Sequence, residues 1–208
     1  MVMNGRGVDH LRAMTRVLCV DDHPAVRAGL LGLLRVEPGF VPVGDASGEW
    51  DLWPLLRRTR PDVVLLDYHL PGRHGLLLCR DIKTMLPPPG VVIYSAFADR
   101  SLALPARLAG ADALVPKGLP ADELFDTLRL VARGDSPRPE ISASHLNTAA
   151  AKLSPEDLPI LGMMLDGSSS ADILDVTGMD TTQLNQRLDS LIGRLAPRPG
   201  RSSEVHPA

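Results

Sequence analysis

The sequence predicts a doubly wound α/β domain with a five-stranded parallel sheet, followed by a smaller all-helical domain. Three observations lead to this fold class. Between residues 16 and 133, five short apolar runs alternate with segments of helical pattern. Each run is apolar throughout rather than at every second position, which is typical of parallel strands covered on both faces. After residue 152, leucines recur at helical spacing beyond a glycine turn, which indicates a packed helix.

The elements of the first domain alternate in order along the chain. Strands are expected at residues 17–20, 40–43, 63–66, 91–94 and 113–115, and helices at 24–34, 50–60, 76–86, 101–109 and 121–133. Pro24 suits the first turn of a helix, whereas Pro105 is expected to kink the fourth helix. Residues 1–15 are polar and aperiodic and are expected to form a flexible arm, so the domain spans residues 16–133.

The second domain has the outline of a helix-turn-helix unit at residues 153–195. It follows a linker at residues 134–152, partly helical near 149–152, and precedes a tail at 196–208 that we expect to be disordered.

Start signals divide this unit into three helices. Ser154 and Pro155 predict the start of the first, and Pro159 inside it is expected to remove a backbone hydrogen bond. Ser170 is expected to cap a short second helix, and Asp180 a longer third one that ends near residue 195. Gly178 forms the turn between them. One face of the third helix carries Leu184, Leu188, Leu191 and Leu195.

Composition limits the class of protein. The chain has 208 residues, of which 44% are apolar and 3% aromatic, and its net charge is −3. This apolar fraction supports a buried core and excludes general disorder. The scarcity of aromatic residues argues against stacking on single-stranded nucleic acid, and the acidic balance argues against a polycation that coats DNA.

Cysteine usage and hydropathy indicate the compartment. Cys19 and Cys79 both lie in apolar surroundings, which predicts buried free thiols in a reducing compartment rather than disulfides or a zinc site. The sequence has no apolar run near the roughly 18–20 residues of a membrane helix, and polar residues interrupt the N-terminus where a signal core would lie. We expect a cytoplasmic protein that does not contact a membrane.

Polar residues gather where the expected strands end. Asp21 and Asp22 follow the first strand, Asp67 the third, Ser95 the fourth and Lys117 the fifth. Because chemistry in open parallel sheets collects at the carboxyl ends of the strands, these side chains are expected to meet. Mg²⁺ would relieve the repulsion between the three acids, and the third-strand acid could act as a nucleophile that forms an acyl phosphate. Each residue alone is most often a turn residue or helix cap; their joint placement points to phosphoryl chemistry.

Four stretches carry a family resemblance: Val20-Asp-Asp-His-Pro24, Leu65-Leu-Asp-Tyr-His-Leu-Pro-Gly72 with Gly75, Tyr94-Ser-Ala96, and Gly110-Ala-Asp112 with Lys117-Gly118. Residues 16–133 resemble the receiver domain of two-component response regulators of the NarL/FixJ group. The resemblance implies flavodoxin-like strand order, a sensor histidine kinase as phosphodonor, and Mg²⁺ as cofactor.

The resemblance also implies residue roles. Asp67 would be the phosphoacceptor, with Asp21, Asp22 and the backbone carbonyl of His69 completing the protein ligands of the metal. Ser95 and Lys117 would bind the phosphoryl oxygens. Leu114 stands where the family commonly has an aromatic switch residue, so phosphorylation is expected to signal less sharply or by another route. Phe97 is expected to shield the acyl phosphate from water or to pack on the fourth helix.

Residues 153–195 resemble the LuxR-type helix-turn-helix, through Leu153-Ser-Pro155, Gly167-Ser168, Thr177-Gly178-Met179 and Arg194-Leu195. In this family the last helix enters the major groove and dimers read paired half-sites. The resemblance implies promoter DNA as partner and a homodimer on activation. The candidate DNA contacts are Thr182, Gln183, Asn185, Gln186, Arg187 and Arg194.

The charge of this second domain leaves three alternatives open. Residues 153–195 hold two arginines and seven acids, a balance of −5, although phosphate neutralisation supplies most of the affinity of DNA-binding proteins. The domain could bind DNA, contact proteins instead, or serve only dimerisation. We favour DNA binding because the helix spacing is intact.

We do not expect the chain to be an enzyme: a haloacid-dehalogenase-like phosphatase would carry its nucleophile after the first strand, with a second Asp where His23 stands. A phosphorylation-independent adaptor is the remaining alternative for the whole chain.

Overall fold

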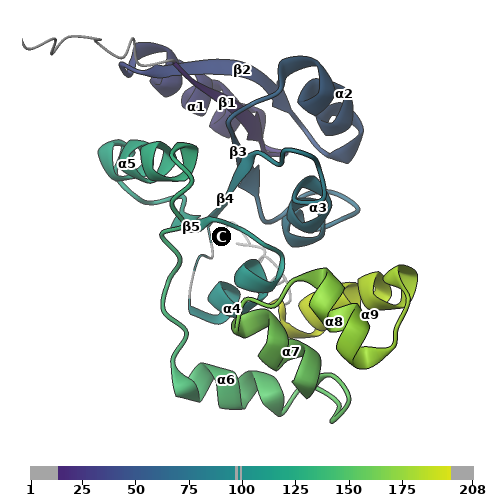
Figure 1. Cartoon of the computed structure of the whole chain (residues 1–208). Helices are drawn as coiled ribbons and strands as arrows, with labels where there is room; N and C mark the ends of the chain where they lie inside the picture. Colours follow the sequence, from purple (N-terminus) through teal and green to yellow (C-terminus); the bar gives the residue numbers. More distant parts are fainter. Residues whose placement is uncertain (1–13, 97, 99, 198–208) are drawn as a thin grey trace, which may run out of the picture.

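The computed structural model describes residues 14–96, 98 and 100–197. The rest of the chain, which includes most of the expected arm and tail and also Phe97, lies outside the described residues. Five strands form one parallel sheet in the order β2-β1-β3-β4-β5 (Figure 1). They are β1 (Thr15–Val20), β2 (Phe40–Ala46), β3 (Val63–Asp67), β4 (Gly90–Ser95) and β5 (Ala113–Pro116). The doubly wound parallel sheet expected from the sequence is confirmed.

Helices cover both faces of this sheet. They are α1 (Pro24–Val36), α2 (Glu49–Thr59), α3 (Gly75–Ile82), α4 (Arg100–Leu108) and α5 (Ala121–Ala132). Residues of α1 and α5 pack in one apolar cluster, and residues of α2, α3 and α4 pack in another on the opposite face. Because both faces are covered, β3 is buried along its whole length, and this explains why its sequence is apolar throughout until Asp67.

Four helices follow: α6 (Ala143–Ala150), α7 (Leu158–Leu165), α8 (Ser170–Thr177) and α9 (Thr181–Leu195). The helical part of the linker, expected near residues 149–152, is wrong in extent, because α6 occupies residues 143–150; residues 134–152 as the linker stay a prediction. The start expected at Pro155 is also wrong. Residues 155–157 form a turn in which the Ser154 hydroxyl donates to Asp157 Oδ2 at 2.8 Å. Pro159 consequently falls in the first turn of α7, where no intrahelical hydrogen bond is lost.

Capping separates the last helices. Ser169, rather than the expected Ser170, caps α8 and forms a reciprocal capping box with Asp172. Asp180 caps α9 as expected, in a second capping box with Gln183. Gly178 ends α8 with a positive φ of 67°, a conformation that glycine adopts without strain.

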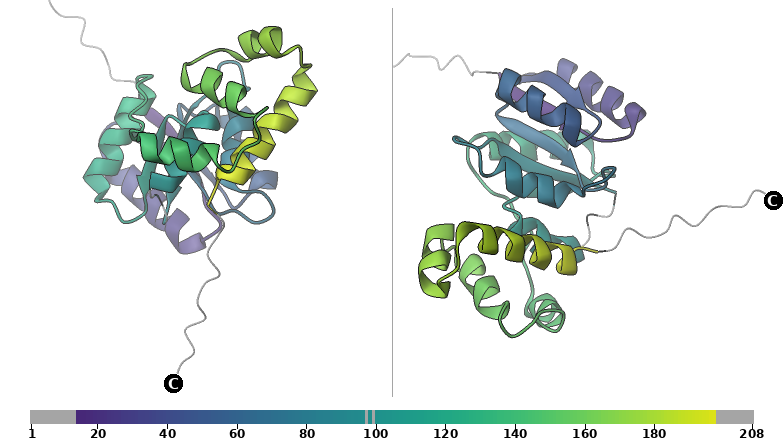
Figure 2. Two further views of the ribbon diagram at one scale, coloured as in Figure 1. Left: turned by 90° about the horizontal axis from the view of Figure 1, so that it is seen from below. Right: turned by 90° about the vertical axis from the view of Figure 1, so that its right-hand side faces the viewer.

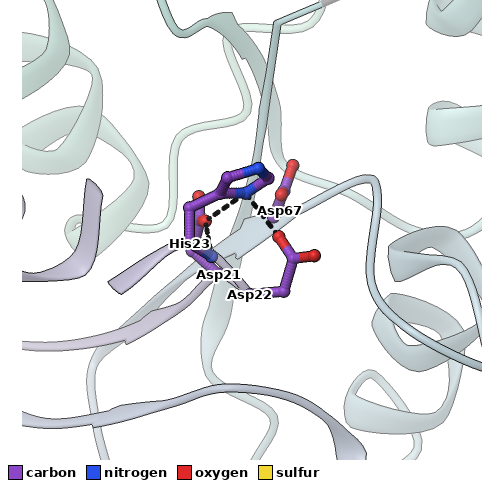
Figure 3. Close-up of side chains that lie close together, drawn as sticks. All are labelled: Asp21, Asp22, His23 and Asp67. Atoms are coloured by element: carbon purple, nitrogen blue, oxygen red, sulfur yellow. Dashed lines mark hydrogen bonds and ion pairs between the residues drawn. The ribbon is translucent and has the colours of Figure 1, made fainter. Parts of the chain in front are cut away.

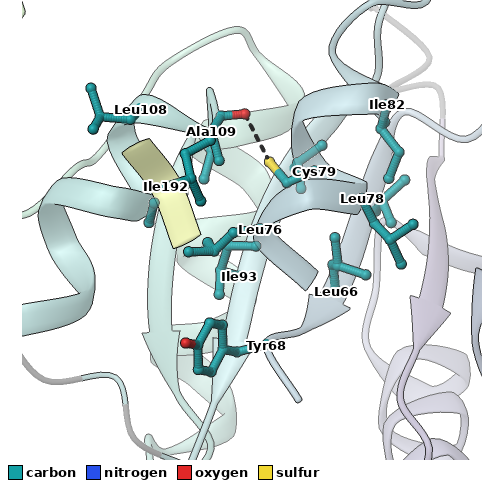
Figure 4. Packing of buried hydrophobic residues seen from close by; sticks show 14 of the residues in the cluster. Leu66, Tyr68, Leu76, Leu78, Cys79, Ile82, Ile93, Leu108, Ala109 and Ile192 are labelled. Atoms are coloured by element: carbon teal, nitrogen blue, oxygen red, sulfur yellow. Dashed lines mark hydrogen bonds between the residues drawn. The ribbon is translucent and has the colours of Figure 1, made fainter. Parts of the chain in front are cut away.

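The helical domain packs directly on the α/β domain. Figure 2 shows α9 lying along α4 and α3, and the buried cluster in Figure 4 includes Ile192 of α9 beside residues of α3 and α4. Leu161 of α7 and Leu195 of α9 belong to the same cluster. The two units therefore share apolar core, although each has its own set of helices.

Both cysteines are fully buried free thiols, as expected from their surroundings. Burial raises the pKa of the Cys19 thiol to about 12, and it also raises the pKa of Cys79, whose sulfur contacts the carbonyl of Ala109. Neither thiol is therefore a reactive thiolate near neutral pH. Among the residues that the structure describes, no helix is long and apolar enough to cross a membrane.

Candidate functional site: an acid pocket at the sheet edge

The acidic residues predicted from the strand ends lie together. Asp21 and Asp67 are 1% and 2% exposed, and Asp22 lies beside them at the surface. Potential ligand atoms of these three acids and of His23 are all within 4.8 Å of one another (Figure 3). The adjacency of β1 and β3 in the sheet produces this pocket, since their carboxyl ends stop at the same edge.

Lys117 closes the pocket from the loop after β5. Its Nζ is 2.6 Å from Asp21 Oδ2 and 2.9 Å from Asp67 Oδ2. Burial alone would lower the pKa of Lys117, but hydrogen bonds to the two carboxylates outweigh it and raise that pKa. The lysine therefore remains an ammonium cation at neutral pH.

One ammonium does not balance three carboxylates. Burial raises the pKa of Asp67, and the hydrogen bond from Lys117 and its charge offset this only in part. The two pKa values rise for different reasons: the pKa of Lys117 rises because it has two anionic partners, while the pKa of Asp67 rises because of burial first and repulsion from Asp21 second. The ionised pocket carries a charge of −2, which a single divalent cation would neutralise.

The donor set of this pocket fits Mg²⁺, which prefers carboxylate and carbonyl oxygens and keeps several waters. Asp21, Asp22 and Asp67 supply carboxylates, and the carbonyl of His69 lies in the loop that β3 enters. The backbone N–H of His69 donates to Asp67 Oδ1 at 3.3 Å, and this hydrogen bond holds the loop after β3 against the pocket.

Ser95 ends β4, next to β3, and its side chain is completely buried. The backbone N–H of Lys117 donates to the Ser95 carbonyl at 2.9 Å, and the Tyr94 hydroxyl donates to the Lys117 carbonyl at 3.3 Å. These bonds position Ser95 and Lys117 relative to each other. Leu114 is partly buried and packs against the cluster that includes α4, so the usual aromatic position is filled by a core side chain.

Gly75 determines how closely α3 approaches the pocket. Its N–H donates to the Tyr68 carbonyl at 2.8 Å, and a Cβ at this position would lie 2.0 Å from the Asp67 carbonyl oxygen. A side chain cannot be accommodated there without moving the backbone that carries Asp67.

The six residues predicted to contact DNA lie on α9, but several have partners inside the protein. Asn185 accepts a hydrogen bond from Arg80 of α3 at 3.2 Å, and the Gln183 side chain is used in the capping box of α9. Arg187 and Arg194 both pair with Asp157, at 3.2 and 2.9 Å. Thr182 and Gln186 are exposed. Their role in DNA binding stays a prediction.

Sequence reasoning missed three residues that connect the parts of this molecule. Arg80 pairs with Asp189 of α9 at 2.9 Å, the Tyr68 hydroxyl donates to the Pro197 carbonyl at 2.7 Å, and buried Asp157 holds the two arginines of α9. The position of Tyr68 directly after Asp67 was the one available signal. The contact of Arg80 depends on how the two domains pack, and those of Asp157 depend on how α7 and α9 pack within the helical domain.

A parallel α/β sheet with this acid pocket defines a receiver-type domain, and comparison with known proteins agrees. The model of the response regulator receiver domain matches residues 17–129, so the chain belongs to the response-regulator family.

The relative DevR/DosR and the structure of ChrA extend the similarity over both domains. The chain is 30% identical to the DNA-binding transcriptional activator DevR/DosR of Mycobacterium tuberculosis, over 88% of each chain. A LuxR-family regulator structure from Aurantimonas is 30% identical with a TM-score of 0.56, covering 65% of this chain and 97% of that one. The structure of response regulator ChrA is 26% identical with a TM-score of 0.54, and the match covers 86% of this chain and 88% of that one. The resemblance to LuxR-type response regulators drawn from the sequence is confirmed.

Proposed function

We propose that this response regulator takes a phosphoryl group from a histidine kinase onto Asp67 in the cytoplasm and thereby controls transcription through promoter binding by α9. The observation that carries the proposal is the convergence of three carboxylates with Lys117 at one sheet edge.

The residues of the pocket account for the transfer. A carboxylate oxygen of Asp67 attacks phosphorus, and the bond between phosphorus and the imidazole nitrogen of the donor histidine breaks as that nitrogen regains its lone pair. Asp21, Asp22, Asp67 and the His69 carbonyl would hold Mg²⁺, which when bound neutralises charge on the phosphoryl oxygens. Lys117 and Ser95 would contact those oxygens in the product, because Lys117 Nζ lies 2.9 Å from Asp67 Oδ2 and Ser95 follows Tyr94, the residue that pairs with Asp67 between β3 and β4.

Phosphorylation of Asp67 would affect α9 through a short chain of contacts. Lys117 would exchange its bond to Asp67 Oδ2 for one to the phosphoryl group. Tyr68, next in the chain, bonds the carbonyl of Pro197 just after α9. A shift of the segment that carries Asp67 and Tyr68 would therefore weaken the packing of α9 on the α/β domain. Once released, the α9 helices of a homodimer would bind paired half-sites.

Intact-mass measurement with acetyl phosphate and Mg²⁺ tests the phosphoryl transfer. The wild-type chain should gain one base-labile phosphoryl group, and Asp67→Asn should gain none. Labelling of Asp67→Asn to the wild-type extent would contradict the proposal.

A salt-dependent mobility shift with genomic DNA fragments, before and after phosphorylation, tests DNA binding by the helical domain. Absence of binding in both states would favour the alternative of protein contact.

A further inference from the structure

A cavity of about 970 Å³ lies at the amino ends of the strands, at the edge of the sheet opposite the acid pocket. It is lined by residues of the segments 56–62, 83–90 and 131–134 and by Asp112, and we call it the basal cavity. The end of α2, the loop between α3 and β4, and the end of α5 therefore meet there. Its volume is within the roughly 300–1,000 Å³ that is usual for small-molecule sites.

The charged side chains that line the basal cavity leave one positive charge. The cations are Arg57, Arg60 and Lys83, and the acids are Asp62 and Asp112. Lys83 Nζ is 2.8 Å from Asp112 Oδ2, and Asp62 Oδ2 accepts a backbone N–H at 2.7 Å. Within the part of the chain that the structure describes, the guanidinium groups of the two arginines have no ion pair or hydrogen bond. Two guanidinium groups therefore remain for a ligand, and the excess of one charge matches a carboxylate better than a phosphate monoester of about −1.5 to −2.

Arg60 has a backbone conformation that favours glycine. Its φ of 42° and ψ of 65° lie in the left-handed region, where a side chain is strained. Among residues 14–96, 98 and 100–197 it is the one non-glycine residue with positive φ. Its N–H closes α2 by donating to the Leu56 carbonyl at 3.0 Å, a bond that glycine would make equally well. The helix end does not require arginine, and the guanidinium is what arginine adds to the basal cavity.

Another wall of the basal cavity is apolar and stiff. Leu86 is 96% exposed, and Pro87 and Pro88 beside it are exposed as well. Proline rings fix φ, so this wall loses little conformational freedom when a ligand covers it. Lys83 Nζ also donates to the Pro89 carbonyl at 3.3 Å, and this hydrogen bond holds the loop in place. The loop therefore offers a preformed apolar surface next to the two arginines.

We propose that the basal cavity binds a small carboxylic acid with an apolar body. Arg57 and Arg60 hold the carboxylate, and the body lies on the loop of residues 85–89. A guanidinium can donate two parallel hydrogen bonds to a carboxylate, and covering the loop removes apolar surface from water. The site gives the α/β domain a second input, separate from phosphorylation of Asp67. The competing role of both arginines is to offset the negative end of the α2 dipole while they remain solvated.

Amide chemical shifts of the ¹⁵N-labelled full chain, titrated with phenylacetate, separate the two roles. The shifts should saturate with a Kd of about 1 mM, within the range for a ligand of this size. They should concentrate at the amides of residues 57, 60, 62, 86, 90 and 132. Acetate lacks the apolar body and 2-phenylethylamine carries the opposite charge, so neither should cause saturating shifts at these amides.

Two variants test the role of the arginine. Arg60→Gly should raise the Kd for phenylacetate by about tenfold or more. Its Tm should stay at or above that of the wild type, because glycine adopts the φ of 42° without strain, so lost binding is not caused by unfolding. Arg58→Ala is the matched control: this exposed arginine in the same turn of α2 does not line the cavity. Its Kd should stay within about twofold of the wild-type value.

Three results would overturn the proposal and leave both arginines as solvated charges at a helix end. They are the absence of saturating shifts at these amides with phenylacetate, equal shifts with 2-phenylethylamine, and an unchanged Kd in Arg60→Gly. Labelling of Asp67 by acetyl phosphate is measured separately, so any of these results would leave the proposed function standing.

Discussion

Arg80 joins the two domains at the helix expected to read DNA, and its removal should release that helix. The guanidinium contacts Asp189 and Asn185 of α9 at 2.9 and 3.2 Å. The Arg80 and Asp189 side chains are 14% and 37% exposed, so the pair is neither a surface contact nor fully buried. Exposed pairs contribute up to about 1 kcal/mol and loss of a buried partner costs about 3–5. We therefore expect a coupling of about 1–2 kcal/mol, a factor of about 5–30 in the equilibrium between docked and free α9.

A double-mutant cycle measures this coupling. Urea unfolding of Arg80→Ala, Asp189→Asn and the double variant should show that the second substitution costs less after the first. In Arg80→Ala, amide hydrogens of α9 should exchange faster, and affinity for promoter DNA should rise by a similar factor because Asn185 is no longer engaged. Arg57→Ala is the control: Arg57 is an exposed arginine of α2, so its substitution removes the same charge at a position outside the interface. A coupling near zero with unchanged exchange in α9 would refute the argument.

Three further predictions follow from the pocket and the helical domain. Asp67→Asn should raise the Tm of the metal-free protein at pH 7: because burial raises the pKa of Asp67, its ionisation reduces stability as pH rises through that pKa, and the gain should vanish below the ordinary value of 3.8. Asp157→Ala should lower the unfolding free energy by about 1–2 kcal/mol, since it removes the buried acid that pairs with Arg187 and Arg194 but leaves two partly exposed arginines, and faster hydrogen exchange confined to α7–α9 would check this. Gly75→Ala should cost about 2–3 kcal/mol in urea unfolding and slow acetyl-phosphate labelling, because the new Cβ displaces the Asp67 backbone; wild-type stability and labelling would contradict that reasoning.

The sequence by itself determined the architecture of the first domain. Continuous apolar runs require a sheet covered on both faces, so the strands were located within a few residues, and the polar residues after them had to share one edge. Local chemistry also determined the Asp180 cap and the Gly178 turn. The local pattern gave a wrong helix start at Ser154-Pro155. The Ser154 hydroxyl donates to the Asp157 side chain within a turn, and α7 begins only at Leu158.

Only the tertiary structure decided how the domains meet. The contact of Arg80 with Asp189 and that of Tyr68 with Pro197 join residues 109 and 129 positions apart, and no local pattern encodes the rotation of α9 that brings them together. The same holds for His23, whose ring direction depends on the folded β1 end and on Asp22. Periodicity specifies which face of an element is buried because burial is a property of that element alone, whereas contacts between polar side chains depend on the relative placement of whole elements.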